Sequence, residues 1–260
     1  VSLMGTPWIV PAKSVEALRQ SVVRPVPGGV SIGHPTITAG THGVSLRFLG
    51  INAGLSNNHV LAAGSTFQQT RANIGDPIYQ PGPHDGGRDV DIVGNLAWYN
   101  PIDVEGSNLI DAALWQPTTP DLMSEEVLDI GVPSGIGTAN VGDIVQKSGR
   151  TTGLQSAEVI DINATISVNY GDFKADFHNQ IITDIMGGPG DSGSAVFDMT
   201  GPNLVGLLFA GSNYVTVHNH IGNMLNAIGP VVNGGGAGGG AVQITAGAVL
   251  STLLLSFGLG

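Results

Sequence analysis

The chain has 260 residues, a formal net charge of −11 and only nine basic residues. Nucleic acids and anionic membrane surfaces both require basic patches, so this composition argues against them as partners. The absence of cysteine excludes a disulfide framework, a thiol nucleophile and a zinc–thiolate site.

The first 122 residues are expected to form an arm followed by a series of short strands. Residues 1–29 are the arm, with a short helix beginning near Ser14 and a break in the Pro/Gly-rich stretch behind it. Residues 30–122 contain apolar runs such as Val44–Leu49 and Leu109–Leu114, separated by clusters of Gly, Pro, Asn and Asp. We therefore expect a first β-domain over residues 30–122.

Residues 123–230 are expected to contain a linker, a second series of strands and one helix. The apolar residues from Ile221 to Ile228 follow helical spacing, Asn219 is a candidate cap, and Gly229 and Pro230 end the pattern. Short strands without helices between them predict an all-β fold of antiparallel barrels or a sandwich. The strands are expected from Ile144 onward, at Glu158–Ile162, Thr165–Tyr170, Ile181–Ile185, Ser194–Phe197 and Leu204–Ala210.

Residues 231–260 are a Gly-rich linker and an apolar tail without charged residues. As a helix, the last twenty residues would span about 30 Å, enough for a bilayer core. Their glycines and polar residues, and the lack of flanking basic residues, argue against a membrane anchor. The alternation from Val242 to Ala246 instead suits addition to a sheet edge. We expect the tail to dock on the same chain or on a neighbouring subunit, and the second case would give a homo-oligomer.

A glycine-flanked serine is the first candidate for chemistry. Ser192 lies in the run Gly190-Asp191-Ser192-Gly193, where the glycines permit a sharp turn. Such a turn can direct the amides of Gly190 and Ser192 at one point, as an oxyanion hole requires. A polar β-turn would use the same residue types, so the tetrapeptide alone leaves both interpretations open.

A nucleophilic serine needs a base, normally a histidine held by a carboxylate. His59 follows an apolar run and precedes small residues, a setting that the other six histidines lack. Asp111 lies within an apolar run, where a buried carboxylate needs a partner. A structural histidine and a solvent-facing aspartate are the alternatives. Asp91 is a competing carboxylate in a more polar stretch.

No metal or cofactor is expected. His218 and His220 form a His-x-His pair, but no carboxylate follows at ligand spacing. Acyl transfer by serine, histidine and aspartate needs no cofactor.

His59, Asp111 and Ser192 occur in the order and in the local contexts of the chymotrypsin/trypsin family of serine peptidases, which residues 30–230 resemble. The run around His59, Asn-Asn-His-Val, is particularly similar to the disulfide-free bacterial branch. The resemblance implies two packed antiparallel six-stranded β-barrels, with the three residues in the cleft between them. With the C-terminal helix predicted from the apolar spacing and the apolar tail after it, these two barrels make up the expected fold.

Two further stretches carry the same resemblance. Gln146–Gly153 is similar to the hairpin that opens the second barrel in bacterial trypsin-like peptidases. Val205–Gly211 resembles the strand that pairs with the substrate backbone, which would give Phe209, Ala210 and Gly211 a substrate-binding role.

The resemblance also locates a specificity pocket. Met186, six residues before the nucleophile, would form the pocket floor, and Gly211 would leave the wall open. Without an acid at the floor, we predict cleavage after an uncharged residue. Two departures from the family pattern are Pro189, directly before the oxyanion-hole glycine, and the start at Val1, which makes insertion of a new amino terminus beside Asp191 doubtful.

The sequence therefore predicts a serine endopeptidase that acts on polypeptides, with secretion or the cell envelope favoured as its location. The alternative is an assembly subunit, of a filament or shell, on a protease-derived scaffold whose tail mediates subunit contacts. Intact His59, Asp111 and Ser192 favour the enzyme, because a scaffold released from catalysis can lose any of them.

Overall fold

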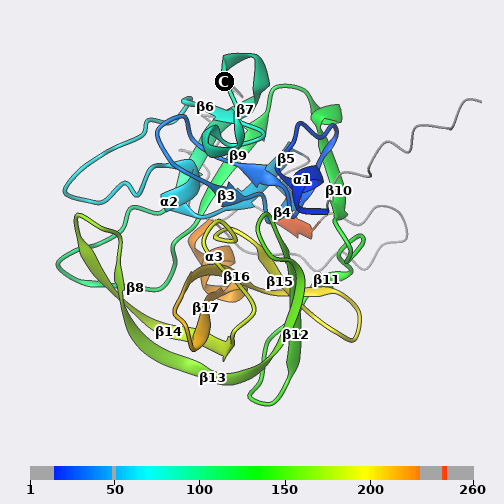
Figure 1. Cartoon of the computed structure of the whole chain (residues 1–260). Coiled ribbons are helices and arrows are strands. Elements are labelled where there is room, and N and C mark those ends of the chain that lie inside the picture. The colour runs from blue at the N-terminus through cyan, green and yellow to red at the C-terminus, as the bar shows by residue number, and fades with distance from the viewer. Residues whose placement is uncertain (1–14, 49–50, 229–241, 245–260) are drawn as a thin grey trace, which may run out of the picture.

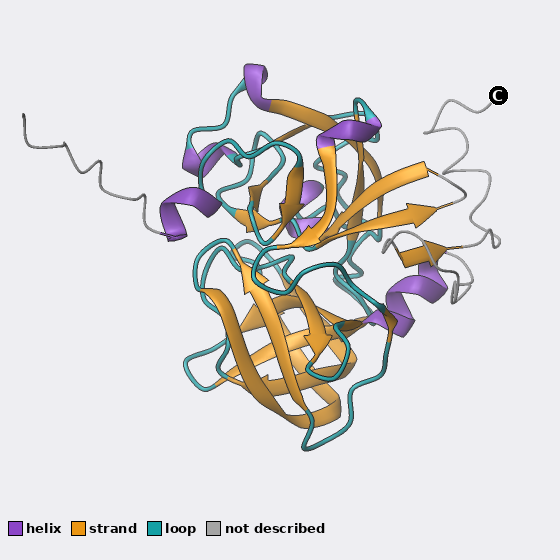
Figure 2. Ribbon diagram, turned by 90° about the vertical axis from the view of Figure 1, so that its right-hand side faces the viewer, coloured by secondary structure: helices purple, strands orange, loops and turns teal. Residues whose placement is uncertain are grey.

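Strands dominate the chain and form two halves, one above the other in Figure 1. The computed structural model describes residues 15–48, 51–228 and 242–244. Figure 2 shows that the helices are few and short beside the strands. The predicted all-β fold is confirmed. None of the helices in these described ranges is long and apolar enough to cross a membrane.

The first half is built around a six-stranded sheet with the order β18-β4-β5-β9-β7-β6. Five of these strands belong to the predicted first domain and pair antiparallel with one another. The sixth, β18, belongs to the predicted tail and pairs in parallel with β4 of the same chain. The bounds are β4 (Val44–Phe48), β5 (Ile51–Ser56), β6 (Pro77–Tyr79), β7 (Ile92–Tyr99), β9 (Ala113–Pro117) and β18 (Val242–Ile244).

Six antiparallel strands of the second half form a closed ring. The order is β12-β13-β14-β17-β16-β15, and pairing of β15 with β12 completes the circle. This ring matches the predicted second barrel and is seen end-on in the lower part of Figure 1. Its strands are β12 (Ile144–Gly149), β13 (Gly153–Asn169), β14 (Lys174–Asp184), β15 (Ala195–Asp198), β16 (Asn203–Gly211) and β17 (Val215–His220).

Short elements tie the two halves together. β8, from the first half, pairs with β14 of the second, and β1, from the arm, pairs in parallel with β10, inside the predicted linker. The remaining strand pairs are β2 with β3 and β11 with β16. The bounds are α1 (Val15–Arg19), β1 (Val26–Gly28), β2 (Ser31–Ile32), β3 (Gly40–Thr41), α2 (Asn58–Leu61), β8 (Ser107–Asn108), β10 (Met123–Val127), β11 (Gly135–Ile136) and α3 (Ile221–Ile228). Three 3-10 turns lie at Pro83–Asp85, Asp89–Asp91 and Pro120–Leu122.

One apolar core runs across both halves. It joins Leu55 and Leu114 of the first half to Phe197 of the second and to Met224 and Leu225 of α3. Burial of such side chains is the main favourable contribution to folding. The predicted helix over residues 221–228 is confirmed, and its apolar face covers this shared core.

The structure differs from the sequence prediction in three elements. The first domain does not supply six strands to its own sheet: β2 and β3 are two residues long each and form a separate pair. The predicted strand at Leu109–Leu114 begins only at Ala113. The predicted strands Glu158–Ile162 and Thr165–Tyr170 form one 17-residue strand, β13, except for Tyr170, which follows its end. Irregular pairing with β14 absorbs the break in alternation. Except for β18, the predicted tail lies outside the described residues.

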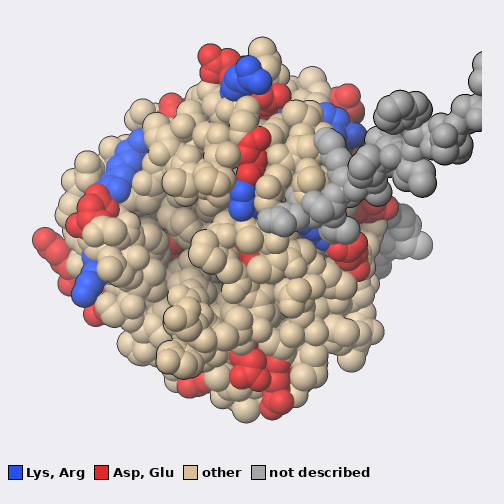
Figure 3. All heavy atoms as spheres, viewed as in Figure 1, with Lys and Arg blue, Asp and Glu red and all other residues tan. Residues whose placement is uncertain are grey.

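Charged side chains are sparse on the surface seen in Figure 3. Lys, Arg, Asp and Glu lie mostly near the outline of the molecule in this view, and large areas between them are uncharged. This distribution follows from the composition, in which charged residues make up 11%.

Candidate active site

Two hydrogen bonds join His59 to Asp111. His59 Nδ1 lies 2.6 Å from Asp111 Oδ2, and the His59 amide donates to Asp111 Oδ1 at 3.2 Å. The Asp111 side chain is fully buried, whereas the His59 side chain is 22% exposed and stays accessible from outside. In this arrangement a carboxylate can fix the tautomer and orientation of a histidine base.

The local sequence brings these two residues together. β5 ends directly before Asn57, and His59 lies in the short helix α2 that follows this strand. Asn57 is buried, and its Nδ2 donates to Asp111 O at 2.7 Å. This bond ties the histidine segment to the aspartate segment.

Asp111 lies just before β9 and takes partners from the second half. Its amide donates to Asn219 Oδ1 at 3.0 Å, and the Tyr170 hydroxyl donates to its Oδ2 at 2.8 Å. Asn219, the expected helix cap, is thus a β17 residue that binds Asp111. Asp91 is engaged elsewhere, with its Oδ2 accepting the Arg88 amide at 3.0 Å. The structure pairs His59 with Asp111 and not with Asp91.

Ser192 follows a type II turn. The Asp191 amide donates to Gly188 O at 3.0 Å, and Gly190 has a φ of +95°. Proline suits the first central position of this turn and glycine the second, so Pro189 favours the turn instead of disturbing it. In the hydrogen bonds of the described residues, the amides of Gly190 and Ser192 donate to no protein acceptor. Free amides on such a turn can serve as oxyanion-hole donors.

Asp191 is buried beside the turn and paired with the fully buried Lys147. Lys147 Nζ lies 3.1 Å from Asp191 Oδ2, and the amides of Thr151 and Thr152 donate to Oδ1 at 2.8 and 3.1 Å. Burial by itself raises the pKa of Asp191, but the Lys147 ammonium and the hydrogen bonds outweigh it and hold this pKa below its usual value. An internal lysine therefore neutralises Asp191.

The Ser192 loop is fixed against the first half. The Thr41 amide donates to Ser192 O at 2.8 Å, and Thr41 Oγ1 donates to Gly190 O at 2.8 Å. Ser56 Oγ donates to Thr41 O at 2.7 Å, and Ser56 precedes His59 by three residues. Among the described residues, no hydrogen bond joins the Ser192 hydroxyl to the His59 ring. Catalytic hydrogen bonds often form only when substrate is bound.

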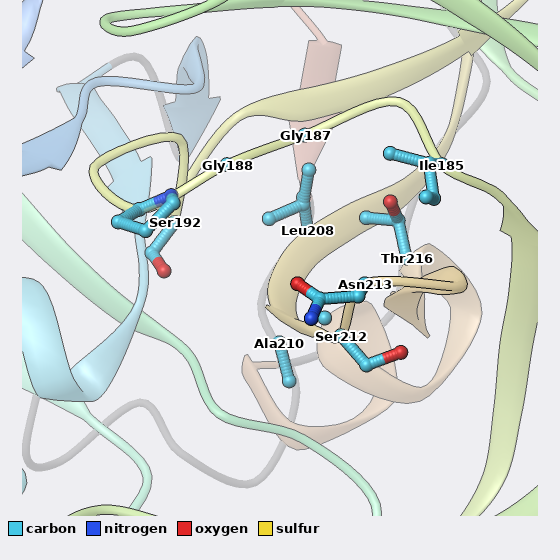
Figure 4. A pocket seen from close by; sticks show the side chains of 11 residues that line it. Ile185, Gly187, Gly188, Ser192, Leu208, Ala210, Ser212, Asn213 and Thr216 are labelled. Carbon is cyan, nitrogen blue, oxygen red and sulfur yellow. The ribbon is translucent and has the colours of Figure 1, made fainter.

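A pocket of about 440 Å³ adjoins Ser192, and the described residues that line it carry no charged side chain. Figure 4 shows Ser192 at one end and Ile185 and Thr216 at the other, with Leu208 between them. We call this the Ser192 pocket. It is lined by Ile185, Gly187, Gly188, Pro189, Ser192, Leu208, Ala210, Gly211, Ser212, Asn213 and Thr216.

Met186, the predicted pocket floor, is not among these lining residues. Its side chain is 2% exposed and packs in a core cluster with Val145 and Val196. Consecutive residues of an extended segment point to opposite sides, so Ile185 and Gly187 line the pocket while Met186 faces the core.

A second pocket, of about 580 Å³, lies beside His59 and shares Ala210, Gly211 and Ser212 with the first. We call it the groove. All three predicted substrate-binding residues, Phe209, Ala210 and Gly211, line it. The other lining residues are His59, Ile166, Ser167, Val168, Asn169, Tyr170, Ser212, Val215 and Val217.

Along Phe209–Gly211, strand β16 has one free edge. Its pairing with β15 reaches only to Leu207, and Leu208 then bonds to Gly193 and Ser194. On the other side Ala210 and Gly211 pair with β17. Within the described sheet, the edge that faces the groove can therefore accept an added strand.

The two candidate metal-binding histidines are engaged with protein groups. His218 Nε2 lies 2.9 Å from Thr183 Oγ1, and His220 Nε2 lies 2.7 Å from Ile162 O. Burial, with a smaller effect of Lys147, lowers the pKa of His218 to about 3. No cluster of three or more His, Cys, Asp or Glu residues that could hold a metal occurs in the part of the chain the structure describes.

Sequence reasoning missed two residues of this site. Lys147 lies in the hairpin motif Gln146–Gly153, and a lysine at an inward position of a strand is the signal that could have found it. Tyr170 precedes the turn at Gly171, where nothing in the local sequence indicates that its hydroxyl reaches Asp111.

Part of the chain is similar in sequence to known serine proteases. Serine protease 2 of Streptomyces fradiae is 43% identical over 79 residues, which cover 30% of this chain and 42% of that protein. Streptogrisin-A of Streptomyces griseus is 45% identical over 76 residues, 29% of this chain and 24% of that protein. The match thus spans less than half of either relative. No protein-family model matches the chain.

Solved structures support the fold. Protease A of Thermobifida fusca has a TM-score of 0.56 at 21% identity, covering 78% of this chain and 95% of that one. A chymotrypsin of Cellulomonas bogoriensis has a TM-score of 0.55 at 21% identity, covering 78% and 94%. The chain thus has a chymotrypsin-like fold, as its motifs predicted, and part of its sequence is similar to serine proteases of Streptomyces.

Proposed function

We propose that the chain is a serine endopeptidase in which Ser192, His59 and Asp111 act as a catalytic triad. The observation that carries the proposal is the 2.6 Å contact between His59 Nδ1 and buried Asp111 Oδ2, where His59 lines a groove that adjoins the Ser192 pocket. It is supported by the glycine turn before Ser192, whose φ at Gly190 is +95°. The similarity to streptomycete serine proteases points to the same chemistry.

The proposed reaction is acyl transfer in two halves. His59 takes the Ser192 proton as Ser192 Oγ attacks the scissile carbonyl carbon, and Asp111 stabilises the resulting imidazolium. His59 then gives the proton to the leaving amine, and the peptide C–N bond breaks to leave an acyl ester on Ser192. Water, deprotonated by His59, attacks the ester carbonyl; the acyl C–Oγ bond breaks, His59 returns the proton to Ser192 Oγ, and the carboxylic acid is released.

The amides of Gly190 and Ser192 stabilise the oxyanion in this proposal. Their turn is held from below by Asp191, which accepts the Gly188 amide at 3.0 Å. It is held from the side by Thr41, which donates to Gly190 O. Donors fixed before the reaction require no reorganisation when charge develops, and each is worth roughly 10²–10³ in rate.

We propose cleavage after an uncharged residue. The Ser192 pocket contains Leu208, Ala210 and Thr216 but no acid or base, so a charged side chain would lose water without gaining a partner. The substrate backbone would add as a strand to the free edge at Phe209–Gly211. Cleavage of a peptide library strongly biased to Arg or Lys would contradict this specificity.

Labelling with a fluorophosphonate probe tests the proposed function. The wild type should be labelled at one site, and Ser192→Ala should abolish the labelling while unfolding at the same urea concentration. Ser156→Ala is the matched control: Ser156 is an exposed serine on β13 that lines neither pocket, and its variant should retain labelling. A folded wild type that is not labelled, or labelling that survives Ser192→Ala, would contradict the triad.

A further inference from the structure

The hairpin between β13 and β14 brings a tyrosine to the back of the His59–Asp111 pair. The Tyr170 hydroxyl donates to Asp111 Oδ2 at 2.8 Å, the same oxygen that lies 2.6 Å from His59 Nδ1. The Tyr170 ring also meets the His59 ring edge-on, with centroids 5.8 Å apart and planes inclined by 62°. One side chain therefore contacts both members of the pair.

The hydroxyl of Tyr170 is held in its protonated, donating form. Burial, together with the Asp111 carboxylate, raises the pKa of Tyr170 well above its usual value. Because Asp111 is fully buried, each donor to its carboxylate replaces a water that it lost on folding. Tyr170 and the His59 ring share Oδ2, and the His59 amide occupies Oδ1. Both carboxylate oxygens are thus fixed.

Contacts of Arg71 with Asp172 and Phe173, which we call the Arg71 strap, join the first half to the hairpin tip. Arg71, from the first half, forms an ion pair with Asp172, and its guanidinium lies 5.2 Å from the centre of the Phe173 ring. Phe173 stacks on Tyr170, with centroids 4.8 Å apart and planes within 16°. The Tyr170 amide closes the tip by donating to Phe173 O at 3.0 Å. Phe173, itself in contact with Arg71, therefore holds the Tyr170 ring in place.

We propose that Tyr170 is a positioning residue of the site: its hydroxyl orients the Asp111 carboxylate for His59, and the Arg71 strap couples that contact to the docking of the two halves. The inference rests on the proposed peptidase function. Its basis is the shared oxygen, the burial of Asp111 and the clamped ring. The ionisable groups that face Tyr170 in the described contacts are Asp111 and His59, with the Arg71–Asp172 pair beyond Phe173.

The test is Tyr170→Phe, which removes the hydroxyl and leaves the stacked ring. Fluorophosphonate labelling rates are measured from pH 5 to 9 on the full chain. We expect a rate about tenfold lower at neutral pH, because an unfixed carboxylate orients His59 poorly and a tenfold loss corresponds to about 1.4 kcal/mol. We also expect the midpoint of the acid limb to move to higher pH, because Asp111 with one donor fewer attracts the imidazolium more strongly.

Tyr79→Phe is the matched control. The Tyr79 hydroxyl, on β6, also donates to a carboxylate, that of Asp89. Because Tyr79 lines neither the Ser192 pocket nor the groove, its removal should change neither the rate nor the profile. A Tyr170 that merely walls the groove would alter KM for a peptide and leave the pH profile in place. An unchanged rate and profile in folded Tyr170→Phe would overturn the inference.

Two further measurements keep the outcomes distinct. If Tyr170→Phe does not fold, Arg71→Gln decides, since it loosens the strap without touching Asp111. A slower, shifted profile for Arg71→Gln supports the inference, and a wild-type profile overturns it. Failure of the proposed function shows differently: the folded wild type itself is then not labelled.

Discussion

The buried pair of Lys147 and Asp191 makes the sharpest prediction about stability. Both side chains are fully buried, and their charged atoms lie 3.1 Å apart. Lys147→Met keeps much of the side-chain volume but leaves the Asp191 carboxylate buried without its cation. Removing one partner of a buried ion pair costs about 3–5 kcal/mol. Of the 5–15 kcal/mol by which domains are typically stable, this is a large part.

Urea unfolding at pH 7, followed by tryptophan fluorescence, measures this loss. With an m-value of about 2 kcal/mol per molar, a loss of 4 kcal/mol moves the midpoint by about 2 M. Lys174→Met is the matched control, because Lys174 is an exposed lysine on β14 and its loss should change stability by less than about 0.5 kcal/mol.

The same experiment at pH 4 tests the electrostatic cause. In the wild type the pKa of Asp191 lies below the usual 3.8, so its stabilising contribution is present above 3.8 and lost only as pH falls through the folded value. In Lys147→Met only the hydrogen bonds oppose burial, so the pKa of Asp191 is higher than in the wild type and protonation relieves the buried charge as pH falls. The difference between variant and wild type should therefore shrink from pH 7 to pH 4. A loss below about 1 kcal/mol at pH 7, or one equal at both pH values, would refute the reasoning.

Two other predictions concern the turn at Gly190 and the buried His218. Gly190→Ala should destabilise the chain by about 1–3 kcal/mol and suppress labelling, because φ is +95° and the new Cβ would lie 2.5 Å from Thr151 Oγ1. Gly75→Ala, with φ of +97° and nothing within 4 Å, should lose stability but keep its labelling rate; equal labelling by both variants would contradict the role of the turn. Burial lowers the pKa of His218 from 6.5 to about 3. The stability that neutral His218 contributes is therefore present above pH 6.5 and is lost as pH falls toward 3. By pH 4 the wild type should have lost about 3 kcal/mol of unfolding free energy through this group. His218→Gln lacks the group, so its unfolding free energy should fall by about 3 kcal/mol less between pH 7 and pH 4. An equal fall in wild type and variant would contradict this prediction.

The features that depend on short stretches of the chain could be predicted from the sequence. Alternating apolar runs with turn residues between them predicted the strands, and helical spacing predicted α3. The glycines around Ser192 predicted a sharp turn, because few other residues adopt positive φ. The choice of His59 and Asp111 over their competitors also followed from local setting, and their hydrogen bond agrees with it.

Tertiary structure decided the contacts between residues far apart in the chain. The direction of the Met186 side chain depends on where β14 ends, because a shift of one residue along an extended segment would turn it from the core toward the pocket. The partners of Asp111 and Asp191 are Tyr170 and Lys147, 59 and 44 residues away. Such buried polar groups find their donors only when barrel closure and docking of the halves bring them together. The local sequence pattern indicates whether a residue is buried, whereas tertiary packing determines which group it contacts.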